Sequence, residues 1–88
     1  MMIKTQGESM IPTLKDGVCY EIDVSLCGSF NKGDIIVFHK DGLTICHRIV
    51  GVFLMKNGNK YYKTKGDNCV CNDPYAITDD MVIGRIII

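Results

Sequence analysis

Three kinds of side chain in this sequence could together perform catalysis by a hydroxyl nucleophile. Ser9 precedes a Met-Ile-Pro segment, His47 lies in an apolar run, and the carboxylates of Asp67 and Asp73 follow in and after a glycine-containing turn. A serine hydroxyl is a weak nucleophile near neutral pH, but a histidine, which ordinarily titrates near about pH 6.5, can accept its proton. A carboxylate on the other ring nitrogen then fixes the tautomer and stabilises the imidazolium. Taken singly, Ser9 also fits an ordinary role as a hydrogen-bonding loop residue.

The elements that position these residues are predicted to be β-strands. Turn sequences such as Asp-Gly and Asn-Gly recur at short intervals, and β-branched, apolar runs separate them. No helical period extends beyond a turn or two, although residues 10–14 and 76–81 each fit a short turn. Strands spaced in this way predict an all-β barrel or folded sheet. The predicted strands cover residues 18–24, 35–38, 43–54, 60–63 and 81–88.

The longest predicted strand contains His47. Because alternate residues of a strand lie on opposite faces, Cys46 and Arg48 should point away from the face that carries the imidazole. The Asn57-Gly58 pair favours a tight reversal, so this strand and the next one should form a hairpin. We therefore expect His47 to lie among apolar neighbours on one arm of a hairpin. The residues predicted to share its face are Leu43, Ile45 and Ile49.

Composition limits the classes of protein that the chain can represent. Its 88 residues, of which 47% are hydrophobic, suffice for one core, so residues 1–88 are expected to form a single domain. Ten basic and ten acidic side chains give no net charge, which argues against a nucleic-acid partner. No apolar stretch has the length of a membrane span, and the start lacks the apolar region of an export signal. A cytoplasmic location is therefore expected.

The cysteine pattern favours free thiols over a disulfide framework. The chain has five cysteines, an odd number that cannot all pair within one copy. Cys69 and Cys71 could join His47 at a metal, but the C-x-x-C spacing of structural zinc sites is absent. We therefore predict neither a metal nor a cofactor. The five are Cys19, Cys27, Cys46, Cys69 and Cys71.

Four segments, in this order, resemble the motifs of type I signal peptidases and their LexA-like relatives. The resemblance implies an all-β, single-domain coiled sheet or half-barrel of the kind that forms the catalytic domain of this superfamily. It covers nearly the whole chain, and Ile-Gly-Arg-Ile at 83–86 is similar to the closing strand. The segments are Gly-Glu-Ser-Met-Ile-Pro-Thr-Leu at 7–14, Lys-Gly-Asp-Ile-Ile-Val-Phe at 32–38, His-Arg-Ile-Val-Gly at 47–51, and Thr-Lys-Gly-Asp-Asn at 64–68 with Asp73.

The resemblance also implies a role for each candidate residue. Ser9 takes the position of the nucleophile, and His47 takes that of the base, where most bacterial members have lysine. Histidine at this position is typical of the endoplasmic-reticulum and archaeal branch, in which an acidic residue assists it. Asp73 is the favoured assistant, and Asp67 is the alternative, with a structural or supporting role otherwise.

The same resemblance leaves the oxyanion donors incompletely specified. The backbone N–H of Ser9 is the first expected donor. Many relatives supply a serine hydroxyl two positions earlier, where this chain has Gly7. Substrates of the family are bound as an extended strand, and Met10 is the candidate substrate-binding residue beside the nucleophile.

Together these observations predict a serine endopeptidase that removes a leader or signal segment from a polypeptide bound in extended form. The absence of an apolar anchor before Ser9 favours a soluble processing peptidase, although a membrane or membrane-protein partner is compatible with it. The alternative is a LexA-like regulatory or binding module that does not cleave, or cleaves only itself. The sequence does not specify the oligomeric state.

Overall fold

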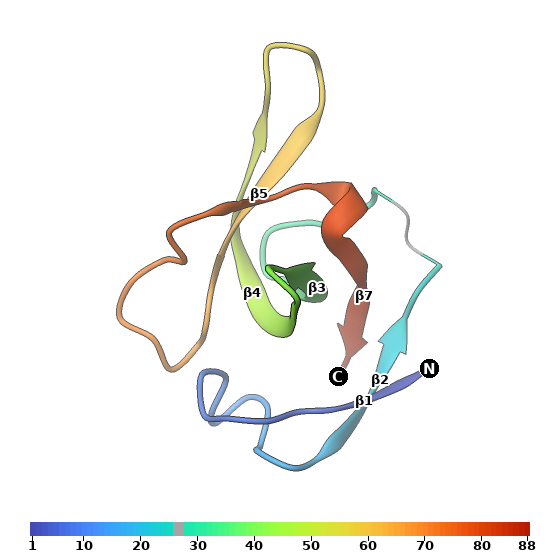
Figure 1. The fold of residues 1–88 in the computed structure, drawn as a ribbon, viewed down its shortest axis with the longest axis vertical. Helices are drawn as coiled ribbons and strands as arrows, with labels where there is room; N and C mark the ends of the chain where they lie inside the picture. The colour runs from blue at the N-terminus through green and yellow to red at the C-terminus, as the bar shows by residue number, and fades with distance from the viewer. Residues whose placement is uncertain (26–27) are drawn as a thin grey trace.

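In a computed structural model, which describes residues 1–25 and 28–88, the chain forms one seven-stranded antiparallel sheet (Figure 1). The strand order is β1-β2-β7-β3-β4-β5-β6. Within the described ranges no helix is long and apolar enough to cross a membrane. Cys27 lies outside the described residues. The elements are β1 (Met2–Lys4), β2 (Cys19–Asp23), β3 (Ile35–Lys40), β4 (Leu43–Leu54), β5 (Lys60–Lys65), β6 (Ala76–Ile77), the 3-10 turn η1 (Asp79–Met81) and β7 (Val82–Ile87).

The predicted all-β fold is confirmed, and the five predicted strands appear as β2, β3, β4, β5 and β7. The two strands that were not predicted, β1 and β6, are three and two residues long. Residues 76–81 form β6 and then η1 rather than one continuous turn. Residues 10–14 form the expected turn, closed by a 2.9 Å hydrogen bond from the N–H of Leu14 to the Met10 carbonyl.

The sheet is curled, so that its first strand faces its middle. Strands β2, β7 and β3 lie between β1 and β4 in the sheet. Nevertheless, residues of β1 and β4 line one cavity, of about 690 Å³. This curvature agrees with the expected coiled sheet and brings the Ser9 segment, which follows β1, opposite β4 (Figure 1).

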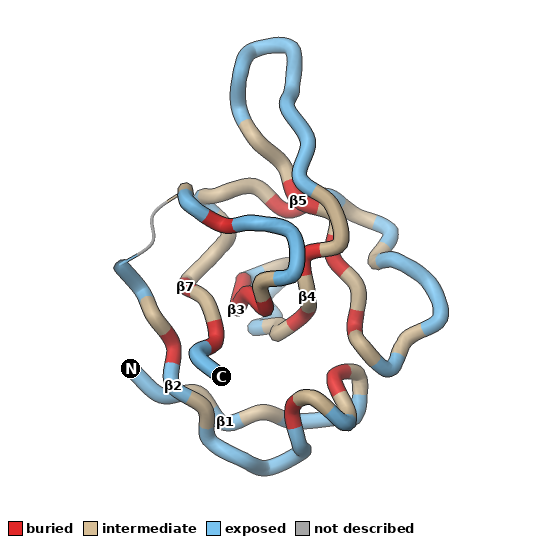
Figure 2. Tube along the Cα trace, turned by 180° about the vertical axis from the view of Figure 1, so that it is seen from behind, coloured by how far each residue is buried: buried red, intermediate tan, exposed pale blue. Residues whose placement is uncertain are grey.

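The central strand β3 is buried on both faces and joins two apolar clusters. It lies in the middle of the molecule, where Figure 2 shows buried chain. Because its side chains alternate, Ile35 and Val37 pack in one cluster and Ile36 and Phe38 in the other. The first cluster also contains Met10, Leu14, Ile22 and Ile86, and the second contains Phe30, Ile49, Tyr62 and Ile77. The Ser9 turn and the His47 strand are thus fixed on the same central strand.

Candidate active site

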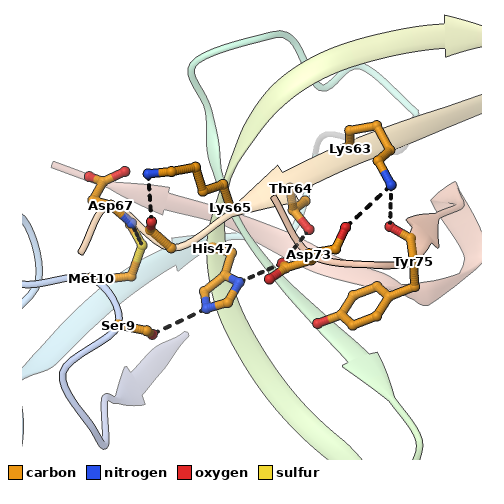
Figure 3. Close-up of polar contacts among 10 residues, drawn as sticks. Ser9, Met10, His47, Lys63, Thr64, Lys65, Asp67, Asp73 and Tyr75 are labelled. Atoms are coloured by element: carbon orange, nitrogen blue, oxygen red, sulfur yellow. Dashed lines mark hydrogen bonds and ion pairs between the residues drawn. The ribbon is translucent and has the colours of Figure 1, made fainter. Parts of the chain in front are cut away.

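Ser9 and His47 lie side by side, although 37 residues separate them along the chain (Figure 3). The Nε2 atom of His47 is 3.1 Å from the Oγ of Ser9, a hydrogen-bond distance. Residue 47 pairs with Ile36 of β3, and the ring of Phe38 meets the imidazole edge to face at 6.4 Å between centroids. The imidazole is therefore held by a central strand and an aromatic neighbour, whereas the half-buried Ser9 lies in a turn.

Asp73 occupies the other side of the imidazole. Its Oδ2 atom lies 2.6 Å from Nδ1 of His47, and the same oxygen accepts a 2.7 Å hydrogen bond from the hydroxyl of Thr64. The N–H of Asp73 donates to the Thr64 carbonyl at 2.8 Å. With a proton on Nδ1 facing the carboxylate, the lone pair of Nε2 faces the serine hydroxyl; these partners assign that tautomer. Of the two predicted carboxylates, the structure thus brings Asp73 to His47.

Asp67 makes a different ion pair, with Arg48. Both of its oxygens accept from the guanidinium at 2.8 Å, and the hydroxyl of Thr13 donates to one of them at 2.6 Å. Hydrogen bonds from Arg48 lower the pKa of Asp67 to about 2, with a further contribution from Thr13, against the opposing effect of partial burial. Asp67 therefore links β4 to the Ser9 segment and lies away from the imidazole.

This ion pair predicts an acid-dependent stability. A carboxyl whose pKa falls from about 3.9 to about 2 on folding stabilises the native state at pH values above about 4, by at most about 2.6 kcal/mol. Solvent screening of this partly exposed pair reduces the figure to about 2 kcal/mol, and the stabilisation is lost as pH falls through about 2. We expect Asp67→Asn to unfold about 2 kcal/mol more easily in urea at pH 7. The gap should narrow between about pH 4 and pH 2. An equal urea midpoint for the two proteins at pH 7 would contradict this assignment.

The turn at 66–68 holds the nucleophile segment in place. The N–H of Asn68 donates to the Ser9 carbonyl at 2.8 Å, and its side-chain amide donates to the Glu8 carbonyl at 3.0 Å. A Cβ at Gly66 would lie 2.6 Å from the Ser9 carbonyl oxygen, a distance that real contacts do not reach. Only glycine allows this close approach. The predicted substrate residue, Met10, lines the cavity but is buried in the core, and its sulfur accepts the N–H of Asp67 at 3.2 Å.

Sequence reasoning missed Thr64, which is fully buried and bonds the Asp73 carboxylate. A signal for it was present: alternation along β5 puts Thr64 on the same buried face as Tyr62. A buried hydroxyl needs a partner, so a threonine on an apolar strand face indicates a polar group opposite. The supporting roles of Gly66 and Asn68 have no comparable signal in one sequence.

The cavity beside Ser9 and His47 lies between residues 3–7 on one side and 42–47 of the chain on the other. Burial raises the pKa of the Cys46 thiol, which also lines it, to about 11. That thiol stays protonated near neutral pH and is a poor nucleophile. The hydroxyls of Ser9 and Thr44 both line the cavity, each beside a histidine, and the imidazole next to Ser9 is the one whose other nitrogen contacts a carboxylate, that of Asp73.

One wall of the cavity exposes the backbone of β4. The N–H of Ile49 donates to the Asp34 carbonyl at 2.8 Å, on the β3 side. In an antiparallel pair, the N–H and C=O groups of successive residues point alternately toward and away from the neighbouring strand. Those of Thr44 and Cys46 therefore point away from β3, toward the cavity. In the described part of the chain, no strand pairs with residues 43–47 on that side.

The opposite wall of the cavity, formed by residues 3–7, also presents backbone groups to the cavity. The N–H of Thr5 donates to the Val18 carbonyl at 3.0 Å, on the β2 side. Alternation therefore directs the backbone groups of Lys4 and Gln6 away from β2, and both residues line the cavity. Two strand edges thus face each other across the space in front of Ser9.

Gly7 does not supply a second oxyanion donor through its backbone. Its N–H donates to the Oδ1 of Asp16 at 2.9 Å, so that proton is already used. The backbone takes a φ of +89° at this residue, a conformation that favours glycine. The N–H of Ser9 itself stays the predicted first donor.

Comparison with known proteins identifies the family. Residues 1–87 match the family described as Peptidase S24-like. The chain belongs to this family. Over 68 residues, the S24-like chain is also 40% identical to the signal peptidase I U of Bacillus subtilis (strain 168), an alignment that covers 68% of the chain and 36% of that relative. The predicted membership of the type I signal peptidase and LexA-like superfamily is confirmed, and the chain spans little more than a third of its relative.

Proposed function

We propose that this chain is a serine endopeptidase of the Ser-His branch, which removes a leader or signal segment from a polypeptide. The observation that carries the proposal is the continuous line of contacts from Ser9 Oγ to His47 Nε2 and from His47 Nδ1 to Asp73 Oδ2, at 3.1 and 2.6 Å. This is the arrangement that hydroxyl nucleophiles require for activation. The name of the signal peptidase relative supports leader removal as the reaction.

The reaction follows from the atoms in contact. Ser9 Oγ attacks the carbonyl carbon of the scissile bond while its proton passes to His47 Nε2, and Asp73 stabilises the imidazolium. The oxyanion that forms is stabilised by the N–H of Ser9. As the tetrahedral adduct collapses, Nε2 returns the proton to the leaving amine, and an ester remains on Ser9. Water then gives a proton to Nε2, attacks the ester and releases the new carboxyl terminus, while Nε2 reprotonates Oγ.

The substrate is proposed to bind as an extended strand between the two walls of the cavity. Backbone groups of Thr44 and Cys46 on one side, and of Lys4 and Gln6 on the other, offer hydrogen bonds to a peptide in that position. Such binding places the scissile carbonyl in front of Ser9. Main-chain pairing supplies affinity, and the apolar lining of the cavity selects side chains.

Cleavage of a mixed peptide library, followed by mass spectrometry, tests this function. We expect the wild type to cut a subset of peptides and Ser9→Ala to cut none of them. Ser29→Ala removes an exposed hydroxyl elsewhere and should behave as the wild type does. Equal cleavage by wild type and Ser9→Ala would assign the activity to another nucleophile. Peptide binding without cleavage, or cleavage of the chain itself alone, would instead favour the LexA-like regulatory module.

A further inference from the structure

Lys63, on β5, contacts the backbone of the segment that carries Asp73. Its Nζ atom lies 3.3 Å from the backbone oxygen of Asp73 and 3.3 Å from that of Tyr75 (Figure 3). The side chain is half-buried, and residue 63 pairs with Ala76 at the start of β6. One ammonium group therefore bridges two carbonyls immediately before the strand pairing begins.

The segment has no regular structure of its own, although the ring of Tyr75 packs edge to face on Phe38 at 6.3 Å between centroids. Residues 66–75 contain no strand, and Pro74, between the two carbonyls, has no N–H to donate. The N–H of Asp73 is fixed by the Thr64 carbonyl at 2.8 Å, which secures one side of residue 73. Irregular segments move more than paired strands, yet the carboxylate of Asp73 must stay within 2.6 Å of the imidazole. The bridge from Lys63 adds an attachment to the backbone carbonyls on both sides of Pro74.

We propose that Lys63 is a positioning residue, whose ammonium group holds Asp73 on His47 by bridging the carbonyl oxygens of Asp73 and Tyr75. Hydrogen bonds from a charged donor are stronger than those between neutral groups, and two acceptors on either side of Pro74 restrict rotation of the segment. The position of Lys63 next to Thr64 means that β5 holds Asp73 both by its backbone and by its carboxylate. The kinetic consequence of this inference rests on the proposed peptidase function.

The variants for the test are Lys63→Met, which keeps the aliphatic stem, and Lys63→Arg, which restores charged donors. Lys56→Met, at the exposed turn of the same hairpin, controls for the loss of one positive charge. The first measurement is the low-field proton resonance of the imidazole N–H that faces Asp73, in an otherwise identical His39→Gln background so that His47 alone contributes. We expect that resonance in the wild type, Lys63→Arg and Lys56→Met, and its loss by exchange with water in Lys63→Met.

The second measurement is peptide cleavage. We expect Lys63→Met to lower kcat by between about 10-fold and 100-fold with little change in KM, as a small displacement of a catalytic group does, and Lys63→Arg to recover most of the loss. If Lys63→Met does not fold, Lys63→Gln, which lacks the charge, replaces it in both measurements.

Two results would overturn the inference: a wild type without the low-field resonance, or a Lys63→Met protein that matches Lys56→Met in both resonance and kcat. The resonance does not depend on turnover. A wild type that cleaves nothing but loses its resonance in Lys63→Met would therefore contradict the proposed function and leave the role of Lys63 supported.

Discussion

Replacing His47 with alanine is expected to lower kcat/KM for peptide cleavage by at least about 10⁴-fold, because the serine hydroxyl then has no base to accept its proton. The activity that persists should come from substrate binding and the oxyanion donor alone. The measurement is cleavage of a peptide chosen from the library, with His47→Ala at the same concentration as the wild type.

The chain provides a matched control for this variant, since it has only one other histidine. His39 is exposed, and its Nδ1 lies 3.1 Å from the Thr44 hydroxyl, so His39→Ala should retain wild-type kcat/KM. His47→Gln, which better preserves the volume of the buried ring, separates loss of the base from loss of packing. Activity within about tenfold of the wild type in either His47 variant would exclude His47 as the base.

Asp73→Asn is expected to lower kcat by about 10⁴-fold while the protein stays folded. The amide can turn its NH₂ group toward Nδ1, which then becomes an acceptor, and the proton moves to Nε2, where it blocks transfer from Ser9. The hydroxyl of Thr64 contacts the same atom as Nδ1 does, so it can accept a hydrogen bond from the NH₂ group in place of donating one, and the packing should be preserved. The measurement is kcat with saturating peptide, together with the thermal unfolding midpoint.

Asp67→Asn is the informative comparison for this prediction. It changes the same atoms in a carboxylate that pairs with Arg48, so it should reduce stability far more than Asp73→Asn does and kcat far less. Small and equal losses of kcat from both substitutions would show that neither carboxylate orients His47.

The sequence predicted the central strands well because their patterns are local. The four-residue apolar run at the start of β3 is buried on both faces, and the Asn57-Gly58 turn fixes the end of β4. β1 and β6 were missed because so short a strand carries little pattern of its own and depends on its partner. Leu43 lies on the predicted apolar face of β4 but is 63% exposed. Alternation assigns each residue to a face of the strand, but it does not say how far along the strand the core extends.

The sequence predicted the residues of the candidate site that lie in motifs and on strands, but it did not decide between the residues that lie in irregular chain. Motif positions indicated Ser9 and His47, and alternation placed Arg48 opposite His47. The choice between Asp67 and Asp73 depended on the path of residues 66–75, which form no strand and follow no period. The structure brings Asp67 to Arg48, so it cannot also bond the imidazole on the other face of β4.

Covalent labelling tests whether His47 activates the hydroxyl of Ser9. A serine-reactive phosphonate forms a stable bond only with an activated hydroxyl, and intact mass followed by peptide mapping locates the adduct. We expect one adduct, on Ser9, that forms far more slowly in His47→Ala and not at all in Ser9→Ala. An unlabelled Ser9 in the wild type, or labelling at the same rate in His47→Ala, would contradict this activation.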